Sequence, residues 1–169
     1  MNDVDFADLL GAPLRAADRM AMGPLEAAWS VTFPEDTALF LSAYGDSVIA
    51  GQINIFGPRT MEEANSFLAP SLAELAGDGD PVIDFGHRPG QLILWGTTPD
   101  GDAFASQVSA AGDEWPTVYF NGLEMEWTRD EVGLTQWLRA ALAGHRRDVF
   151  PELGSLPHSV TELEDRPFG

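Results

Sequence analysis

Residues 33–59 read FPEDTALFLSAYGDSVIAGQINIFGPR, and the rest of the chain is interpreted around this stretch. Pro34 suits the first turn of a helix, where its missing N–H costs nothing, and the two carboxylates after it complement the positive end of the helix dipole. Apolar residues then recur at three- and four-residue spacing up to Tyr44, and Gly45 can adopt the left-handed conformation that closes a helix. The sequence therefore predicts a short amphipathic helix that ends at Gly45.

β-Branched residues dominate the second half of the same stretch. They lie in a run bounded by glycines, at Val48, Ile49, Ile53 and Ile55. Such a run is typical of a strand. Helix, glycine stop, strand and turn together form a folding unit, and the unit contains no catalytic motif.

This unit and later parts of the chain contain a set of mostly aromatic, glycine and proline positions: Leu25-Glu26, Phe33-Pro34, Phe40-Leu41, Tyr44-Gly45, Ile55-Phe56-Gly57-Pro58, Leu94-Trp95-Gly96, Asp100-Gly101-Asp102 and Phe150-Pro151. These positions resemble the SUKH superfamily, which holds fungal cell-wall synthesis regulators and many bacterial toxin-immunity proteins. They span residues 24–151, and Asp46 stands where the family often has a second glycine. The resemblance implies a protein partner and supplies no catalytic residues.

Charge is the strongest signal in the composition. The chain has 27 acidic residues against 9 basic ones, all of them arginine, which gives a formal net charge of −18. This balance argues against nucleic acid as a partner, because phosphate binding needs a basic surface. The absence of lysine excludes Schiff-base chemistry and a phosphate-loop lysine. The acidity either serves solubility or steers the protein toward a basic partner.

Length and residue usage set further bounds. A chain of 169 residues is long enough for one domain with a substantial core. The absence of cysteine excludes disulfides, thiolate metal sites and cysteine nucleophiles. The chain has no run of eighteen apolar residues, and its first residues, MNDVDFADLL, are acidic rather than basic. We therefore expect a cytoplasmic protein with no membrane span.

Local patterns predict the remaining elements. Two capping boxes, at residues 60–63 and 128–131, predict helix starts, with a break of the first helix at Pro70. Strands are predicted at residues 48–55, 82–85, 91–97, 103–108, 117–120 and 123–127, with Asn121-Gly122 as a hairpin turn. We expect an α+β fold, with a mainly antiparallel sheet of about five to six strands and with N-terminal, inserted and C-terminal helices.

The predicted domain organisation has three parts. Residues 1–23 form an N-terminal helical extension, residues 24–151 form the SUKH-like domain, and residues 152–169 form a C-terminal tail that is packed on the domain or trails from it. The tail is rich in proline, glycine and acids, so we expect an ordered loop that fades into a mobile end.

Patterns for catalysis and metal binding fail on spacing. An EF-hand loop needs glutamate at position twelve, and that position is Pro89 when counted from Asp78 and Ala111 when counted from Asp100. The histidines, His87, His145 and His158, form no helical metal pair and are expected at the surface. No G-x-S-x-G elbow is present. We expect no enzyme activity, cofactor or metal, although a hydrolase that uses acidic loop residues remains an alternative.

Candidate partner-binding residues combine acids with an exposed aromatic ring: Tyr44, Asp46, Asp100, Asp102, Asp113, Glu114, Trp115, Glu124 and Glu126. Trp115 is expected to be partly exposed at a loop edge, as in an interface hot spot. Glu124 and Glu126 are expected to project from one side of a strand whose other side carries apolar residues. We expect a monomer or weak dimer that binds a protein partner: either an immunity protein that neutralises a basic toxin, such as a nuclease, or a regulatory or scaffolding domain with a housekeeping partner.

Overall fold

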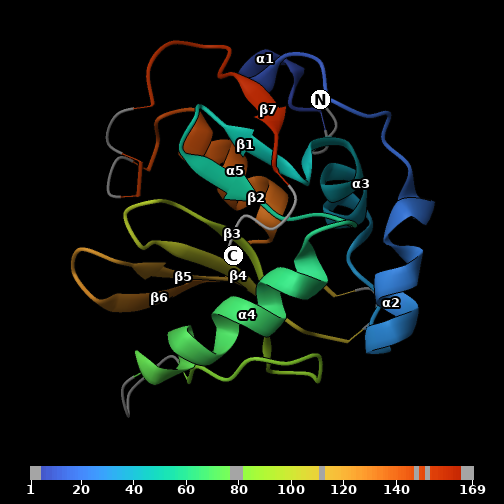
Figure 1. Cartoon of the computed structure of the whole chain (residues 1–169), viewed down its shortest axis with the longest axis vertical. Coiled ribbons are helices and arrows are strands. Elements are labelled where there is room, and N and C mark those ends of the chain that lie inside the picture. The colour runs from blue at the N-terminus through green and yellow to red at the C-terminus, as the bar shows by residue number, and fades with distance from the viewer. Residues whose placement is uncertain (1–4, 77–81, 111–112, 147–148, 151–152, 165–169) are drawn as a thin grey trace.

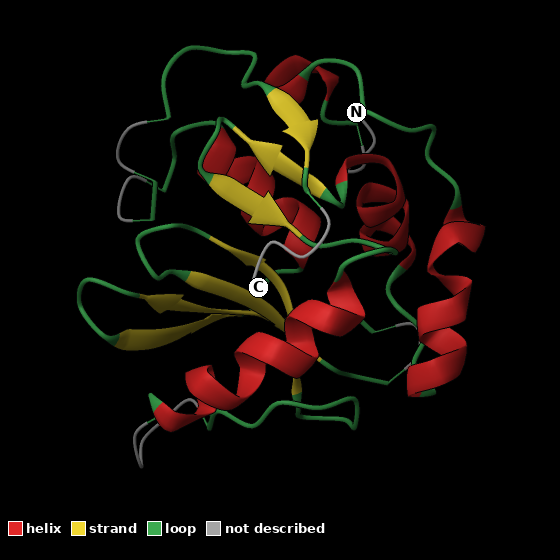
Figure 2. Cartoon of the chain, in the orientation of Figure 1, coloured by secondary structure: helices red, strands yellow, loops and turns green. Residues whose placement is uncertain are grey.

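The computed structural model describes residues 5–76, 82–110, 113–146, 149–150 and 153–164. Its α-helices are α1 (Ala7–Leu10), α2 (Gly23–Trp29), α3 (Glu35–Tyr44), α4 (Met61–Glu74) and α5 (Leu134–Leu142), with a 3₁₀ helix η1 (Arg19–Met22). Its strands are β1 (Ser47–Ile49), β2 (Ile53–Ile55), β3 (Leu92–Thr97), β4 (Ala103–Gln107), β5 (Thr117–Asn121), β6 (Glu126–Asp130) and β7 (Val160–Glu162). The fold is therefore α+β, as the sequence predicts (Figures 1 and 2).

The strands form one seven-stranded sheet in the order β6-β5-β4-β3-β2-β1-β7. Every neighbouring pair is antiparallel, which confirms the predicted sheet type. The strand count is slightly higher than predicted for two reasons. The run at 48–55 folds into two strands, because Ala50 and Gly51 both adopt positive φ angles of 54° and 67° and turn the chain. The C-terminal segment adds β7.

Helix α5 packs on one face of the sheet, and α4 is bonded to the edge of β3. Figure 1 shows α5 behind β1 and β2, and α4 on the side nearer the viewer. On the α5 face, the Trp137 ring lies 6.0 Å from Trp95, 5.4 Å from Phe104 and 5.3 Å from Tyr119, measured between ring centroids. Side chains alternate along a strand, so the other face of the same strands carries a second apolar cluster, formed by Leu92, Ala105 and Val118. Apolar and aromatic side chains from both helices and strands are buried in this core: Phe40, Tyr44, Ile53, Ile55, Leu94, Trp95 and Trp137.

The end of α3 differs from the predicted glycine stop. Gly45 is extended, with φ −69° and ψ 168°, and the left-handed residue is Asp46, with φ 54°. Glycine is needed at position 45 for a steric reason. A Cβ atom there would lie 2.2 Å from the Leu41 carbonyl oxygen and 2.8 Å from the Gly57 Cα. The two glycines therefore let the end of α3 pack directly against the turn that precedes α4.

The first capping box correctly predicts the start of α4, at Met61, but its capping hydrogen bond is absent, and the second box is wrong. The Thr60 side chain makes no capping bond to α4, and it donates instead to the Asp46 carboxylate. The helix α4 also continues through Pro70 to Glu74 without the predicted break. At the second box, residues 126–130 are needed to pair with β5, so they form β6, and α5 begins later, at Leu134.

Two other predicted strands also change. At residues 82–85, the described chain forms only an isolated parallel bridge between Phe85 and Leu92, and Val82 is exposed. The predicted loop at 77–81 lies outside the described residues. At residues 123–127, the first part belongs to a turn, and β6 starts only at Glu126.

Segments outside residues 24–151 contribute to the same core as the rest of the chain. Phe6, Leu9 and Leu10 are buried with α3, and the Phe6 ring lies 4.6 Å from the Phe40 ring. The described part of the predicted C-terminal tail, residues 153–164, packs on the domain, where β7 pairs with β1. His158, expected at the surface, is buried, and its backbone N–H donates to the Leu9 carbonyl over 2.7 Å. The two ends of the described chain therefore meet.

A partly buried ion pair fixes η1 and α2 against the start of α3. The Glu26 carboxylate accepts from Arg19 over 2.5 and 2.8 Å and from the backbone N–H of Phe33 over 2.8 Å. Burial alone raises the pKa of Glu26, but the bonds from Arg19 and Phe33 outweigh it, so the pKa lies below its usual value. The ionised carboxylate is therefore more stable in the folded chain than in the unfolded chain.

We expect the replacement Glu26→Gln to lower the free energy of unfolding at neutral pH by about 1–2 kcal/mol, since it removes charge-assisted hydrogen bonds. A lowered folded pKa gives stability that is present above the unfolded pKa and lost as pH falls. The difference in the free energy of unfolding between wild type and variant should therefore be constant above about pH 6 and shrink below about pH 4.5. Urea unfolding across this range measures it, with Glu74→Gln, an exposed carboxylate on α4, as the control. A difference that does not change with pH would contradict the assignment.

Candidate functional site

Two neighbouring loops pack together at one end of the sheet. Residues 98–102 join β3 to β4, and residues 122–125 join β5 to β6. The Gly122 N–H donates to Asp102 Oδ1 over 2.9 Å, and the other carboxylate oxygen accepts from the Thr98 hydroxyl over 2.9 Å. A Cβ atom on Gly122 would lie 2.7 Å from the Asp100 carbonyl oxygen, so only glycine lets the loops approach this closely. Asp102 therefore joins the two loops.

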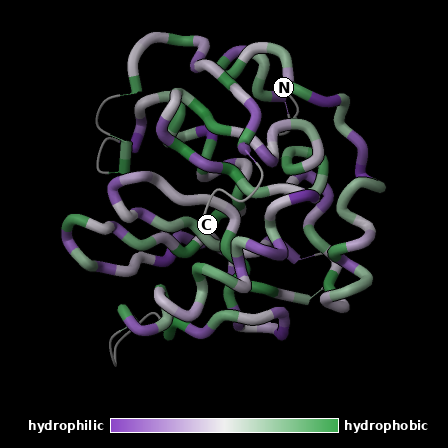
Figure 3. The backbone as a smooth tube through the Cα atoms, viewed as in Figure 1, coloured by the Kyte–Doolittle hydropathy of each residue, from purple (hydrophilic) through white to green (hydrophobic). Residues whose placement is uncertain are grey.

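We define the tip surface as exposed residues of these loops together with the first residue of β6: Asp100, Leu123, Glu124, Met125 and Glu126. Its two apolar side chains are unusually accessible, since Leu123 is 91% exposed and Met125 is 55% exposed. Carboxylates flank them on the same loops. Figure 3 shows this as hydrophobic (green) segments between hydrophilic (purple) ones in the loop that joins β5 to β6. The tip surface thus pairs apolar contact area with negative charge.

The backbone of the tip surface is held in a defined shape. The Asn121 side-chain oxygen accepts from the N–H groups of Leu123 and Glu124 over 3.0 and 3.1 Å, and its carbonyl accepts from the Met125 N–H over 2.8 Å. Met125 has φ 56°. A residue with a Cβ atom loses about 1–2 kcal/mol in this left-handed region, where glycine is the usual residue. The turn therefore presents a methionine where a glycine would be more stable.

A small hollow adjoins the tip surface. It has a volume of about 330 Å³ and is lined by the acids Asp100 and Asp102 and by apolar residues that include Ile53, Phe150 and Leu153. Ile53 and Phe150 belong to the buried core, so the apolar lining continues from the interior. An apolar group placed in this hollow would have carboxylates beside it.

Four of the predicted partner-binding residues thus come together: Asp100, Asp102, Glu124 and Glu126. Three are exposed, whereas Asp102 is half buried and its carboxylate is occupied by the two loops. The predicted geometry of the two glutamates is wrong. Leu123 and Met125 do not form the covered face of a strand, because the turn extends from Gly122 to Met125 and leaves both side chains in solvent.

Tyr44 and Asp46 are not on an open face, which corrects their predicted placement. Each is only 3% exposed. The Tyr44 hydroxyl donates to the Gly11 carbonyl over 2.7 Å, and burial, with Asp5 and Asp8 nearby, raises the pKa of Tyr44 above its usual value. A partner cannot reach either side chain without unfolding the surrounding structure.

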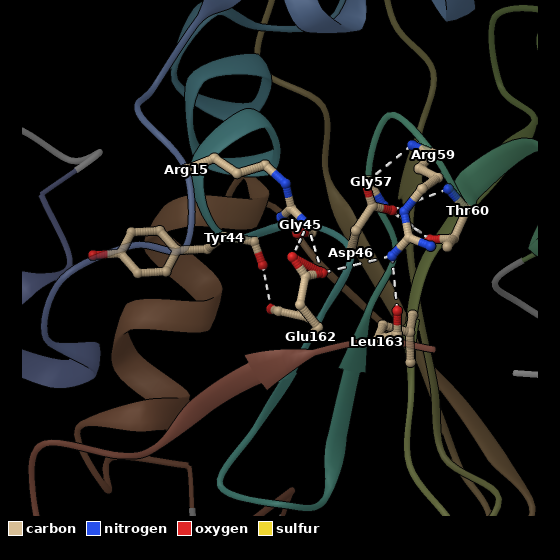
Figure 4. A network of polar contacts seen from close by, with 10 residues as sticks. Arg15, Tyr44, Gly45, Asp46, Gly57, Arg59, Thr60, Glu162 and Leu163 are labelled. Carbon is tan, nitrogen blue, oxygen red and sulfur yellow. Dashed lines mark hydrogen bonds and ion pairs between the residues drawn. The ribbon is translucent and has the colours of Figure 1, made fainter. Parts of the chain in front are cut away.

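The Asp46 carboxylate lies at the centre of a polar network (Figure 4). Oδ1 accepts from the N–H groups of Gly57 and Thr60, over 3.0 Å each, and from the Thr60 hydroxyl over 2.6 Å. Oδ2 accepts from the Arg59 N–H over 3.0 Å. The carboxylate therefore satisfies the backbone donors of the turn that leads into α4, which is a structural role.

Two arginines extend this network to the C-terminal strand. Arg15 bonds the carboxylate of Glu162 on β7 and donates to the Gly45 carbonyl over 3.1 Å. The Arg59 guanidinium donates to the Leu163 carbonyl over 2.7 Å. Figure 4 shows both side chains converging on the end of β7 from different parts of the chain. These contacts hold β7 on the sheet.

Trp115 was expected to be partly exposed, and this is wrong, since it is 2% exposed. Its ring lies 5.1 Å from the Phe33 ring, so it joins the core. Asp113 and Glu114 are exposed, but they precede β5 and so lie at the opposite end of that strand from the tip surface. Glu114 accepts from the Gly133 N–H over 2.8 Å, just before α5. The structure therefore separates these three residues from the tip surface.

The described residues contain no group of three or more His, Asp or Glu side chains placed to hold a metal ion. Of the histidines, His145 is exposed as predicted, and His87 is half buried against Trp29. Within the same described ranges, no helix has the length and apolar character needed to cross a bilayer.

Comparisons with protein-family models, with curated proteins and with solved structures each find no match to this chain. Leu123 and Met125 are the residues of the tip surface that sequence reasoning missed. Their alternation with acids predicts a half-buried strand. The opposing signal was Asn121, which can bond the backbone two and three residues ahead and so lengthen the turn.

Proposed function

We propose that this chain is a non-enzymatic protein-binding domain that uses its tip surface to occlude a basic partner. Its most concrete form is a SUKH-type immunity protein that neutralises a basic toxin in the cytoplasm. The observation that carries the proposal is the exposure of Leu123 and Met125 on a preorganised, acid-flanked turn. Exposed apolar side chains on a rigid loop give contact area at little entropic cost.

Charge supports the same reading. The chain has a formal net charge of −18. Three of its acids, Asp100, Glu124 and Glu126, lie on the tip surface beside the apolar pair Leu123 and Met125. Opposite charge on a partner raises the association rate, while apolar anchors slow dissociation. An inhibitor that must capture a toxin quickly gains from both effects. The resemblance of residues 24–151 to the SUKH superfamily supports the immunity role in particular.

Co-purification from the native cell, followed by identification of the captured protein, tests the proposal. We expect Leu123→Ser to raise the dissociation constant of that complex by about tenfold or more, mainly through faster dissociation. Met125→Gly should also weaken binding, while it raises the free energy of unfolding by up to about 1 kcal/mol because strain is relieved. Leu156→Ser is the matched control, since Leu156 is an exposed apolar residue in the C-terminal segment.

The charges and the toxin role need separate measurements. Glu124→Gln with Glu126→Gln should slow association and reduce its dependence on salt. The captured protein should arrest growth when it is expressed alone, and co-expression with wild type, but not with Leu123→Ser, should restore growth. A harmless partner would favour the regulatory or scaffolding alternative. Equal binding by all the tip variants would refute the tip surface as the interface.

A further inference from the structure

A second surface, on the other side of the fold from α5, has its own chemistry. A groove of about 490 Å³ lies between α4 and residues 84–87, with the end of α2 beside it. We call it the α4 groove, and its lining includes Trp29, Glu62, Ser66, Asp84, Phe85 and His87. Figure 2 shows α4 crossing in front of the sheet, with the loop that carries residues 84–87 beneath it.

Hydrogen bonds hold both walls of the α4 groove in place. On one wall, the Asn65 side chain donates to the Leu94 carbonyl over 2.9 Å and accepts from the Leu94 N–H over 2.8 Å, which fastens α4 to the edge of β3. On the other wall, Gln91 accepts from the Arg88 N–H and donates to Asp84 Oδ2, both over 3.0 Å. The groove is therefore formed before any ligand arrives.

The polar groups of the α4 groove are mainly acceptors. Glu62 and Asp84 contribute carboxylates, and both residues are exposed. Pro70 lies inside α4 and has no N–H, so the Ser66 carbonyl lacks the helical hydrogen bond that it would otherwise receive. None of the lining residues is a lysine or arginine; Arg88 lines the neighbouring hollow that shares Trp29 and His87. A ligand here needs donors and positive charge.

Aromatic rings complete the lining. The His87 ring stacks on Trp29 with centroids 4.3 Å apart and an interplanar angle of 12°. Burial lowers the pKa of His87 more than the nearby Glu62 raises it, so the imidazole is neutral at pH 7 and does not repel a cation. Phe85 adds a half-buried ring. Aromatic faces next to carboxylates suit a planar cation, because guanidinium stacks on rings and also bonds carboxylates through its paired N–H groups.

We propose that the α4 groove binds an arginine side chain presented by a basic segment of a protein partner. Neither a toxin nor the tip surface enters this inference, so it stands apart from the proposed function. Charge complementarity selects the occupant, because an arginine supplies hydrogen-bond donors and positive charge to the carboxylates of Glu62 and Asp84. The planar guanidinium group also fits beside the aromatic pair formed by Trp29 and His87. The neutral aromatic stack and the acidic rim together define the subsite.

Titration with the peptide acetyl-Gly-Arg-Gly-amide, followed by NMR of the Trp29 indole and His87 ring signals, tests this inference. We expect saturable shifts of both signals at millimolar peptide. The matched peptide with citrulline in place of arginine, which keeps the shape and removes the charge, should bind about tenfold more weakly or not at all. Equal shifts with both peptides, or shifts confined to residues outside the groove, would overturn the proposal.

Variants then localise the site. Glu62→Gln and Asp84→Asn, made singly and together, should reduce the affinity for the arginine peptide, with about a tenfold loss in the double variant. Glu63→Gln is the matched control, because Glu63 is an exposed neighbour on α4 that does not line the groove. Thermal melting confirms that each variant is folded. If the double variant does not fold, the affinities of the two single variants are compared with that of wild type. Affinity that is unchanged in every folded groove variant would place the peptide elsewhere and refute the site.

Discussion

Replacement of Asp46 by alanine should lower the free energy of unfolding by about 3–5 kcal/mol, a large share of the stability of a domain of this size. The carboxylate accepts from the backbone N–H groups of Gly57, Arg59 and Thr60 and from the Thr60 hydroxyl. Asp46 is 3% exposed, so water cannot replace those acceptors without opening the structure. The loss should exceed that of a surface carboxylate many times over.

Two further variants separate the role of the acceptors from that of the charge. Asp46→Asn keeps one oxygen for Gly57 and Thr60 but turns an amide toward Arg59, so about 1–3 kcal/mol should be lost. Asp100→Ala removes an exposed carboxylate from the tip surface and should change stability by less than about 0.5 kcal/mol. Urea unfolding measures all three. A variant Asp46→Ala within about 1 kcal/mol of wild type would show that the network adds little.

Replacement of Trp95 by alanine should cost about 3–5 kcal/mol, because it leaves a cavity in the centre of the core. Trp95 is 1% exposed, and its ring packs 5.5 Å from Phe104 and 6.0 Å from Trp137. Phe104 lies on β4 and Trp137 lies on α5. Removal of the indole ring should therefore weaken the packing of α5 on the sheet. Denaturant unfolding, followed by far-UV circular dichroism, measures the change.

Trp95→Phe is the informative companion to that variant. The Trp95 indole N–H is buried and has no hydrogen-bond partner among the described residues, and phenylalanine removes this donor while it keeps most of the ring. Its cost should therefore be much smaller, at about 1–2 kcal/mol, since the gain from removing an unsatisfied donor offsets part of the lost contact area. Equal losses for Trp95→Phe and Trp95→Ala would contradict this account of the site.

Much of the fold follows from local patterns in the sequence. The helix at 35–44, the strands at 92–97 and 103–107 and the buried Trp137 lie in apolar segments bounded by turn residues, and tertiary structure keeps them. Capping boxes were less reliable, because the same pattern of residues occurs in β6, where pairing with β5 decides the conformation. The three-residue β7 has no strong local signal, since its pairing with β1 depends on contacts distant in sequence.

The candidate site was predicted only in part for a related reason. Acids in glycine-rich turns usually lie at the surface, and Asp100, Glu124 and Glu126 do. The same reasoning failed for Asp46, because the Gly57–Thr60 turn needs a buried acceptor and no local pattern reveals that need. It also failed for Trp115, whose polar neighbours in sequence say nothing about the Phe33 ring that covers it.

The position of β7 has a consequence for the order in which the chain can fold during synthesis. Val48 in β1 pairs with Thr161, so more than a hundred residues beyond β1 must leave the ribosome before this edge of the sheet is closed. Until then, β1 presents unpaired backbone groups, which can pair with the strand of another nascent chain. Arg15 and Arg59 are made much earlier, and they are in place to capture Glu162 and the Leu163 carbonyl when the last strand emerges.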